Sequence, residues 1–364
     1  MAEADPRIDR LRLIRSANVG PVSYRQLVTR FGSATAALDA LPRLAARGGG
    51  RTPVIAPEDG VRREIARTER LGARYLFLDD ADYPPLLAEI ENAPPALILR
   101  GSLDLVARPC VAMVGARNAS AAACRFARQL AEALAAEGIT VVSGLARGID
   151  TAAHTGALGG GTVGVIASGI DIAFPPENAG LQEAVAERGL LVAEQPPGTE
   201  PRARHFPYRN RIIAGLSLGT VVVEAAPKSG SLITARLAAE AGREVMAAPG
   251  SPLDPRAQGC NLLIREGATL VQSAADVAEM LRPIDPRSVR SPGIRYDAAP
   301  IAEEAGETER RTVVRLLSPV PVPVDELVRQ SGLAPAIVQT VLLELELAGR
   351  LERHAGARVS LDAG

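Results

Sequence analysis

Short, continuously apolar runs recur along the chain from about residue 74, and longer amphipathic stretches such as SAAACRFARQLAEALAAEG separate them. Most of these runs do not alternate between apolar and polar residues, as expected for strands that are buried on both faces. The repeated order of strand, helix and strand predicts an α/β fold, a doubly wound and largely parallel Rossmann-like sheet with helices on both sides. The predicted strands are RYLFLDD, PALILRGS, VAMVG (111–115), TVVSGL (140–145), TVGVIASG (162–169), LLVAEQ (190–195), GTVVVEAA (219–226), EVMAAPG (244–250) and ATLV (268–271).

A different pattern precedes the sheet. Residues 8–46 have the periodicity of short helices, with an NVGP turn between the first two, and RGGGRTP (47–53) follows as a loop. We therefore expect a small helical domain over 1–72 and the extended Rossmann-like domain over 73–282. The NVGP turn resembles a helix-hairpin-helix, whose glycine turn offers backbone N–H groups to a phosphate, although a plain packing hairpin is the alternative.

The end of the chain has its own organisation. Residues 283–307 contain four prolines and no periodicity, which predicts a linker. Residues 308–364 follow as helix, helix, helix and hairpin, the order of a winged-helix domain. The segment that would be its recognition helix, 335–348, carries Glu344 and Glu346 and no basic residue, so we favour protein contact over duplex DNA for this domain.

Composition narrows the class of protein. The 364 residues are 47% hydrophobic and 23% charged, with a formal net charge of -1, which is ordinary for a globular protein. Three widely spaced cysteines with no C-x-x-C pair argue against a disulfide framework and a zinc site, and they favour a reducing cytoplasm. We expect no membrane association, because no stretch reaches the roughly 18 apolar residues of a spanning helix.

One segment departs from this average. PRARHFPYRNR, residues 201–211, holds four arginines, a histidine, a phenylalanine and a tyrosine without an acidic residue, in a chain with five Phe, five Tyr and no Trp. Guanidinium groups bind phosphate oxygens, and aromatic faces accept bases. The segment therefore indicates a nucleic-acid surface, with an exposed loop solvated by its own charges as the alternative.

Three turns that follow predicted strands have related chemistry. The strings are GARNAS, GLARGIDTAAH and APKSGSLITARLAAE, and none is a G-x-G-x-x-G or a P-loop sequence. Because ligands bind at the carboxyl ends of parallel strands, we expect these turns and PRARHFPYRNR to line one anion-binding cleft. Each turn combines glycine with a basic side chain and a hydroxyl or carboxyl group: Gly115, Arg117 and Ser120; Gly144, Arg147 and Asp150; Gly230, Lys228 and Ser231.

Six strings, in order from about residue 82 to 270, resemble the successive motifs of the DprA/Smf family, the DNA-processing proteins of natural transformation. They are MVGARNAS, VVSGLARGIDTAAH, SGIDIAFPPEN, HFPYRNRIIAGLS, VVVEAAPKSGSLITARLAAEAGREVMAAPGS and GCNLLIREGA. The resemblance implies a Rossmann-like core that binds single-stranded DNA, forms a homodimer and helps to load the RecA recombinase, without a cofactor. Ala116 departs from the family, which often has serine at this position, so a hydroxyl contact is in doubt there.

The same resemblance implies a set of DNA-contacting residues. We expect Arg117, Arg209 and Arg211 to neutralise phosphates or stack on bases, and Asp150 and Glu224 to have structural roles. The full implied set is Gly115, Arg117, Ser143, Gly144, Phe206, Arg209, Asn210 and Arg211, with Arg147, Lys228 and Ser231 as weaker candidates.

Two other classes of function remain open at this point. A nucleotide-binding or nucleotide-hydrolysing Rossmann-like enzyme would need a carboxylate at the bound sugar, for which Glu224, Asp150 and Glu240 are the candidates. A transcriptional regulator would use the winged helix on duplex DNA. We expect neither an enzyme nor a metal site, because the three histidines show no suggestive pairing with Cys or Ser and no metal-ligand cluster is present in the sequence.

Overall fold

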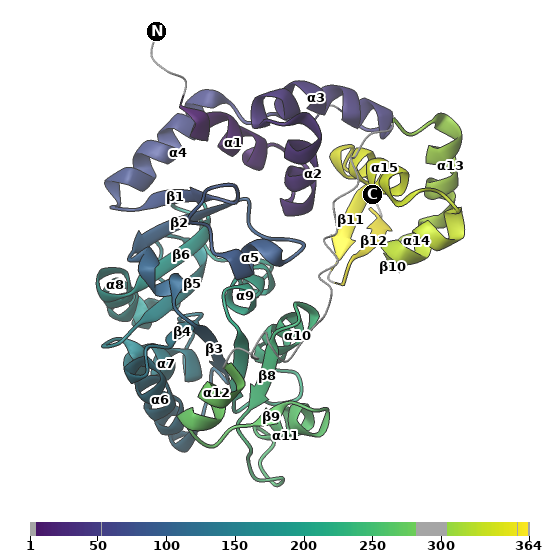
Figure 1. Ribbon diagram of the computed structural model, residues 1–364. Helices are drawn as coiled ribbons and strands as arrows, with labels where there is room; N and C mark the ends of the chain where they lie inside the picture. The colour runs from purple at the N-terminus through teal and green to yellow at the C-terminus, as the bar shows by residue number, and fades with distance from the viewer. Residues whose placement is uncertain (1–4, 52, 282–303, 355, 363–364) are drawn as a thin grey trace, which may run out of the picture. The chain divides into compact units, whose positions relative to one another are not determined.

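The computed structural model describes residues 5–51, 53–281, 304–354 and 356–362 (Figure 1). The chain divides into two compact units, one of which joins Met1–Arg63 to Ser291–Gly364, while the other is Glu64–Arg290. Most of the predicted linker, residues 283–303, lies outside the described residues.

The unit Glu64–Arg290 is built on a nine-stranded sheet with the order β1-β2-β6-β5-β4-β3-β7-β8-β9. Strand β2 pairs antiparallel with β1 and β6, and the remaining pairs are parallel. The predicted, largely parallel sheet is confirmed. The strands are β1 (Arg74–Phe77), β2 (Ala96–Gly101), β3 (Cys110–Gly115), β4 (Thr140–Ser143), β5 (Thr162–Gly169), β6 (Leu190–Gln195), β7 (Gly219–Val223), β8 (Glu244–Ala247) and β9 (Thr269–Leu270).

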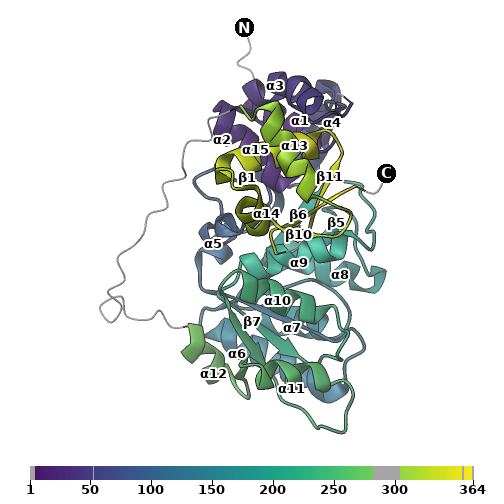
Figure 2. The ribbon, with the colours of Figure 1, turned by 90° about the vertical axis from the view of Figure 1, so that its right-hand side faces the viewer.

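Both faces of the sheet are buried, which explains the continuous apolar runs. In β3, Ala112 and Val114 belong to one core cluster, while Val111 and Met113 belong to the other. Helices α6, α7 and α12 supply the second cluster, and Figure 2 looks onto the opposite face, which α9, α10 and α11 cover. The helices are α5 (Pro85–Glu89), α6 (Ala121–Ala136), α7 (Ile149–Ala157), α8 (Ala179–Arg188), α9 (His205–Gly215), α10 (Ser231–Glu240), α11 (Gln258–Arg265) and α12 (Ala274–Leu281), with 3-10 turns η1 (Leu103–Ala107) and η2 (Pro176–Asn178).

The other unit contains the predicted helical module and the predicted winged helix. Its winged-helix part has three helices and a three-stranded sheet of order β10-β12-β11, as the sequence indicates. The two modules share a core cluster and fall within one compact unit. The elements are α1 (Pro6–Arg15), α2 (Pro21–Phe31), α3 (Ala34–Arg47), α13 (Glu307–Leu316), β10 (Val322–Pro323), α14 (Val324–Ser331), α15 (Pro335–Leu347), β11 (Leu351–His354) and β12 (Arg358–Leu361), while α4 (Glu58–Arg70) spans the boundary between the units.

Three properties of the described part of the chain bear on function. No helix there is long and apolar enough to cross a membrane. No group of three or more His, Cys, Asp or Glu side chains is arranged to hold a metal ion. All three cysteines are free thiols, and two of them, Cys110 and Cys260, are buried.

Candidate nucleic-acid interface

The turns after β3, β4 and β7 meet at one edge of the sheet. The backbone N–H of Ala116 donates to the carbonyl of Glu224 (2.7 Å), and that of Ile149 donates to the carbonyl of Ala116 (3.3 Å). A Cβ on Gly115 would lie 1.9 Å from the carbonyl oxygen of Val223, so the ends of β3 and β7 approach too closely for a side chain. The predicted convergence of these turns is therefore present in the structure.

A cation and several aromatic rings form the exposed layer at this edge. Arg117 is exposed, and its guanidinium carbon lies 5.1 Å from the centroid of the Phe206 ring. Phe206 contacts Phe174 in turn, with centroids 5.7 Å apart and planes tilted by 54°. Phe174 is 43% exposed, and Tyr208, on the same helix as Phe206, is 54% exposed. We call Arg117, Phe174, Phe206 and Tyr208 the aromatic surface.

Beneath this layer, Arg209 is a buried support. It is only 7% exposed, and its Nη2 donates to the carbonyl oxygen of Gly144 (3.0 Å). A Cβ on Gly144 would lie 1.7 Å from Nη1 of Arg209, so only glycine leaves room for the guanidinium. The carboxylate of Asp150 accepts from the N–H groups of Gly144 (3.1 Å) and Ala146 (3.3 Å). Asp150 thus has a structural role, as predicted. It accepts from backbone N–H groups in the turn before α7 and does not cap that helix, whose N-cap is Gly148.

Burial changes the acid–base behaviour of this pair in opposite directions. Burial lowers the pKa of Arg209 to about 10, an effect that the Asp150 carboxylate opposes, so the guanidinium stays charged at neutral pH. Burial raises the pKa of Asp150, and the positive charge of Arg209 opposes that rise. Each group therefore stabilises the charged form of the other.

Two further predicted contacts turn out to be internal. Arg211 is 4% exposed, and its Nη2 donates to Oε1 of Glu194 (2.5 Å). Ser143 is fully buried, and its hydroxyl donates to the carbonyl oxygen of Met113 (2.6 Å), which links β4 to β3. The expectation that Arg209 and Arg211 neutralise phosphates directly is corrected here, because a guanidinium sealed among protein groups cannot reach a phosphate. Their placement makes them positioning residues.

The remaining predicted residues differ in their exposure to solvent. Arg147 is exposed and paired with Glu177, which raises the pKa of the arginine and lowers that of the glutamate. Lys228 is exposed in the turn before α10, whereas Ser231 is buried with its hydroxyl 2.7 Å from that of Ser229. Asn210 is half-buried on α9.

Phe174 is the member of the aromatic surface that the sequence reasoning did not select. It lies between β5 and η2, in the string SGIDIAFPPEN. The signal that was available is an aromatic residue in a Pro-rich turn of a chain with only five phenylalanines, since an exposed ring in such a turn has no packing role to explain it.

The segment PRARHFPYRNR is partly helical. Helix α9 begins at His205, so Phe206, Tyr208 and Arg209 lie within its first turns. The spacing of three residues between Phe206 and Arg209 places them on neighbouring positions of the helix surface. Arg202 and Arg204, which precede the helix, are both exposed. Helix α9 thus supplies a half-buried ring at Phe206, an exposed ring at Tyr208 and a buried guanidinium at Arg209.

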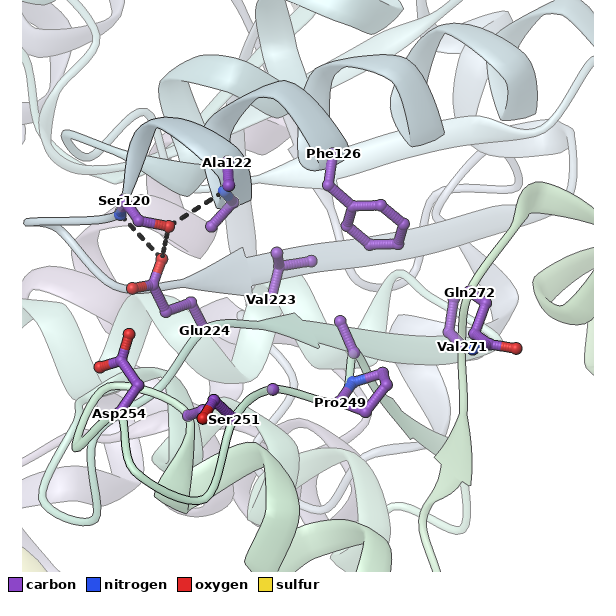
Figure 3. Close-up of a pocket in the computed structure, with 14 residues that line it drawn as sticks. Ser120, Ala122, Phe126, Val223, Glu224, Pro249, Ser251, Asp254, Val271 and Gln272 are labelled. Atoms are coloured by element: carbon purple, nitrogen blue, oxygen red, sulfur yellow. Dashed lines mark hydrogen bonds between the residues drawn. The ribbon is translucent and has the colours of Figure 1, made fainter.

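A separate cavity of about 450 Å³ opens beside the first turn, between α6 and the loop after β8 (Figure 3). Glu224 lines it, but Oε2 of this residue accepts from the backbone N–H (2.8 Å) and the hydroxyl (2.9 Å) of Ser120. Its Oε1 lies 3.1 Å from Nε of Arg256. Glu224 thus has the structural role that the sequence predicts. No lysine or arginine is among the residues that line this cavity, so it does not suit a phosphate.

Comparison with known proteins covers almost the whole chain. The family model described as DNA recombination-mediator protein A matches residues 74–282, the DprA-like N-terminal HHH domain matches 4–67, and the DprA winged helix domain matches 297–357. The DNA processing protein DprA of Streptococcus pneumoniae strain R6 is 48% identical over 205 residues, 56% of this chain and 72% of that protein. Protein Smf of Escherichia coli K12 is 37% identical over 315 residues, 84% of this chain and 82% of that protein.

Two solved structures are similar as well. The X-ray structure of DprA from Streptococcus pneumoniae matches with a TM-score of 0.66 and 36% identity, over 78% of this chain and all of that one. A structure of DprA from Helicobacter pylori, whose description concerns its single-stranded DNA binding mode, matches with a TM-score of 0.53 and 27% identity, over 57% of this chain and 95% of that one. Since one family model alone covers more than half of the chain, this chain belongs to the DprA/Smf family of DNA recombination-mediator proteins.

Proposed function

We propose that this chain binds single-stranded DNA on the aromatic surface, with Arg117 as the central cation. The observation that carries the proposal is the placement of the exposed Arg117 guanidinium over the Phe206 ring. A guanidinium held flat on an aromatic ring presents its N–H groups at the rim, where a phosphate oxygen can accept them. Exposed rings next to it can stack with bases.

The geometry favours an unpaired strand over a duplex. Base faces are available for stacking only when a strand is unpaired, whereas a duplex offers phosphates and groove edges. Phe174 presents exposed ring area in contact with Phe206, and Tyr208 is exposed two residues further along α9. The exposed Arg202 and Arg204 add positive charge at the start of α9, and charge of this kind attracts the sugar–phosphate backbone. The single-stranded DNA named in the description of the Helicobacter pylori relative agrees with this chemistry.

We also propose that the protein is not an enzyme. Among the carboxylates near the sheet edge, Glu224 is engaged with Ser120 and Arg256, and Asp150 with backbone N–H groups and Arg209. The buried His154 is equally unsuited to acid–base chemistry, because burial lowers its pKa to about 3 and its Nδ1 lies 2.8 Å from the interior hydroxyl of Thr162. Free base should therefore not accumulate when the protein is incubated with nucleoside monophosphates.

The wider role comes from the family. We infer that the chain protects incoming single strands and helps to load RecA during natural transformation, as a homodimer in the cytoplasm. This part of the proposal rests on the DprA/Smf membership, and no residue of this chain is assigned to the RecA contact or to the dimer interface.

A competition experiment tests the binding proposal. Labelled oligo(dT) is bound to the protein at fixed ionic strength and displaced with unlabelled single strand or with duplex of the same length. We expect the single strand to displace the label at a concentration at least tenfold below that of the duplex, because only the single strand can stack on the aromatic surface. Equal displacement by the duplex would instead favour the winged helix as the DNA-binding element.

A further inference from the structure

Helix α15, which occupies the place of a recognition helix in the winged helix, is buried along two stripes. Val338, Val341, Leu342 and Leu345 pack in the winged-helix core. Leu343 and Leu347 instead belong to a core cluster with residues of α1, α2 and α3. A helix that is apolar on both sides has partners on both sides. The face that would enter a DNA groove therefore packs against the N-terminal helices.

Polar contacts follow the same outer stripe. Nε2 of Gln26 donates to Oε1 of Gln339 (3.0 Å), and Nδ2 of Asn18 donates to the carbonyl oxygen of Leu347 (3.2 Å). Nη1 of Arg350, just after the helix, donates to the carbonyl oxygen of Gly48 (2.9 Å). Gln339, Leu343 and Leu347 are spaced by four residues, so they lie along one side of the helix, and Arg350 extends the contact beyond its end.

The two glutamates of α15 are part of this packing and do not face a groove. Glu344 is fully buried, and its Oε2 accepts from Nε of Arg310 (2.7 Å). Oε2 of Glu346 accepts from Nε of Arg353 (2.7 Å), and burial raises the pKa of Glu346, opposed by Arg353 and Ser23. The acidic helix in the sequence thus indicated an internal interface, and not a surface that repels DNA.

The glycine turn of the N-terminal hairpin is covered by the same contact. The N–H of Gly20 donates to the hydroxyl of Ser23 (2.7 Å), and a Cβ on Gly20 would lie 3.3 Å from Oε1 of Glu346. The Asn18 amide in this turn is the group that donates to Leu347. Helix α15 therefore lies against the Gly20 side of the turn, while Asn18 stays exposed.

We propose that the winged helix is a docking module whose partner is the chain's own N-terminal helices. The contact makes the two ends of the chain one cooperative folding unit. It also buries the outer face of α15 and restricts access to one side of the hairpin turn at 18–20, the two surfaces that such modules present to nucleic acid. Nucleic-acid binding then falls to the unit that carries the aromatic surface.

The variant Gly48→Ala isolates this contact. Gly48 has φ -70° and ψ -3°, a conformation that alanine adopts without strain, so the N-terminal helices alone tolerate the change. In the docked unit the new Cβ would lie 2.1 Å from the carbonyl oxygen of Glu344, a backbone atom on α15 that cannot turn aside. Hydrogen–deuterium exchange of the full chain should therefore rise tenfold or more in α2–α3 and in α15 together, with the sheet unit unchanged.

Two other substitutions serve as a control and as a second test of the same contact. Gly60→Ala, whose Cβ would meet only a Pro57 ring carbon at 3.5 Å, is the matched control and should leave exchange as in the wild type. Arg350→Ala removes one hydrogen bond to Gly48, so it should raise exchange in the same two regions by a few-fold even if Gly48→Ala does not fold.

Three outcomes would overturn the proposal. The first is faster exchange limited to the end of α3 while α15 stays protected. The second is protection that depends on protein concentration, which would assign the N-terminal helices to a second copy. The third is a loss of oligo(dT) affinity that accompanies the rise in exchange, because we expect the affinity of the variants to stay within twofold of the wild-type value. The exchange result stands whether or not the chain binds single-stranded DNA, so the two proposals fail separately.

Discussion

Arg117→Ala is expected to weaken oligo(dT) binding by roughly ten- to a hundredfold, about 1.4–2.8 kcal/mol. The substitution removes an exposed charge and also the group that lies over the Phe206 ring. For single strands, log affinity falls against log salt by about 0.7 for each neutralised phosphate, so the variant should lose about 0.7 from that slope. Fluorescence anisotropy titrations at several salt concentrations measure both quantities.

Two companion variants make this result specific. Arg125→Ala removes an equally exposed arginine from α6, and it should keep wild-type affinity if placement and not mere charge decides binding. Arg117→Lys retains the charge but loses the planar group that stacks on Phe206, so its affinity should lie between those of the wild type and Arg117→Ala. Equal losses for Arg117→Ala and Arg125→Ala would show that the protein binds through diffuse charge.

Arg209→Met is expected to have the largest effect on stability, lowering the free energy of unfolding at neutral pH by about 3–5 kcal/mol. The change removes the arginine that most strongly stabilises the charged Asp150 carboxylate in the interior and leaves only the weaker effect of Arg117. The pKa of Asp150, already raised by burial, should then rise further, while the unfolded chain keeps an ordinary carboxyl. Because the folded state binds more protons than the unfolded state between these two values, stability falls as pH rises through that window. The loss should therefore be greatest near pH 7 and smaller near pH 5, as urea unfolding at both values can measure.

The double variant that combines Arg209→Met with Asp150→Asn tests whether Asp150 causes this pH dependence. Without the carboxylate, the difference between the two pH values should largely disappear, although some destabilisation from lost packing and hydrogen bonds will remain. Arg128→Met, on the exposed side of α6, provides the control for a change of arginine to methionine at the surface. A pH-independent loss in Arg209→Met would mean that Asp150 is not the group that Arg209 serves.

The fold could be predicted because its signals are local. Apolar runs such as VAMVG indicated strands with two buried faces, and the glycine-containing turns after them indicated the carboxyl edge of the sheet. The antiparallel pairing of β2 with both β1 and β6 was not predictable, because ALIL carries the same apolar pattern as the parallel strands.

The sequence predicted which residues lie at the site more successfully than it predicted the role of each residue. The sequence gives no sign that Arg117 and Arg209 differ in exposure. In the structure, α9 begins at His205 and places Phe206 in the aromatic surface, while the guanidinium of Arg209 lies in the interior and donates to the carbonyl oxygen of Gly144. Exposure of this kind depends on which neighbours the tertiary structure brings close. The joining of the chain ends was hidden for the same reason, since Leu343 and Leu347 read as ordinary core positions until α1–α3 are seen to cover them.

Photo-cross-linking with an oligonucleotide that carries 5-iodouracil is the most direct test of the central claim that a single strand lies on the aromatic surface. Irradiation joins such a base to an aromatic side chain in contact with it, and mass spectrometry locates the modified peptide. We predict cross-links at Phe174, Phe206 or Tyr208, with a strong reduction in Arg117→Ala. Cross-links confined to the N-terminal helices or the winged helix, with none on α9 or at Phe174, would contradict the account.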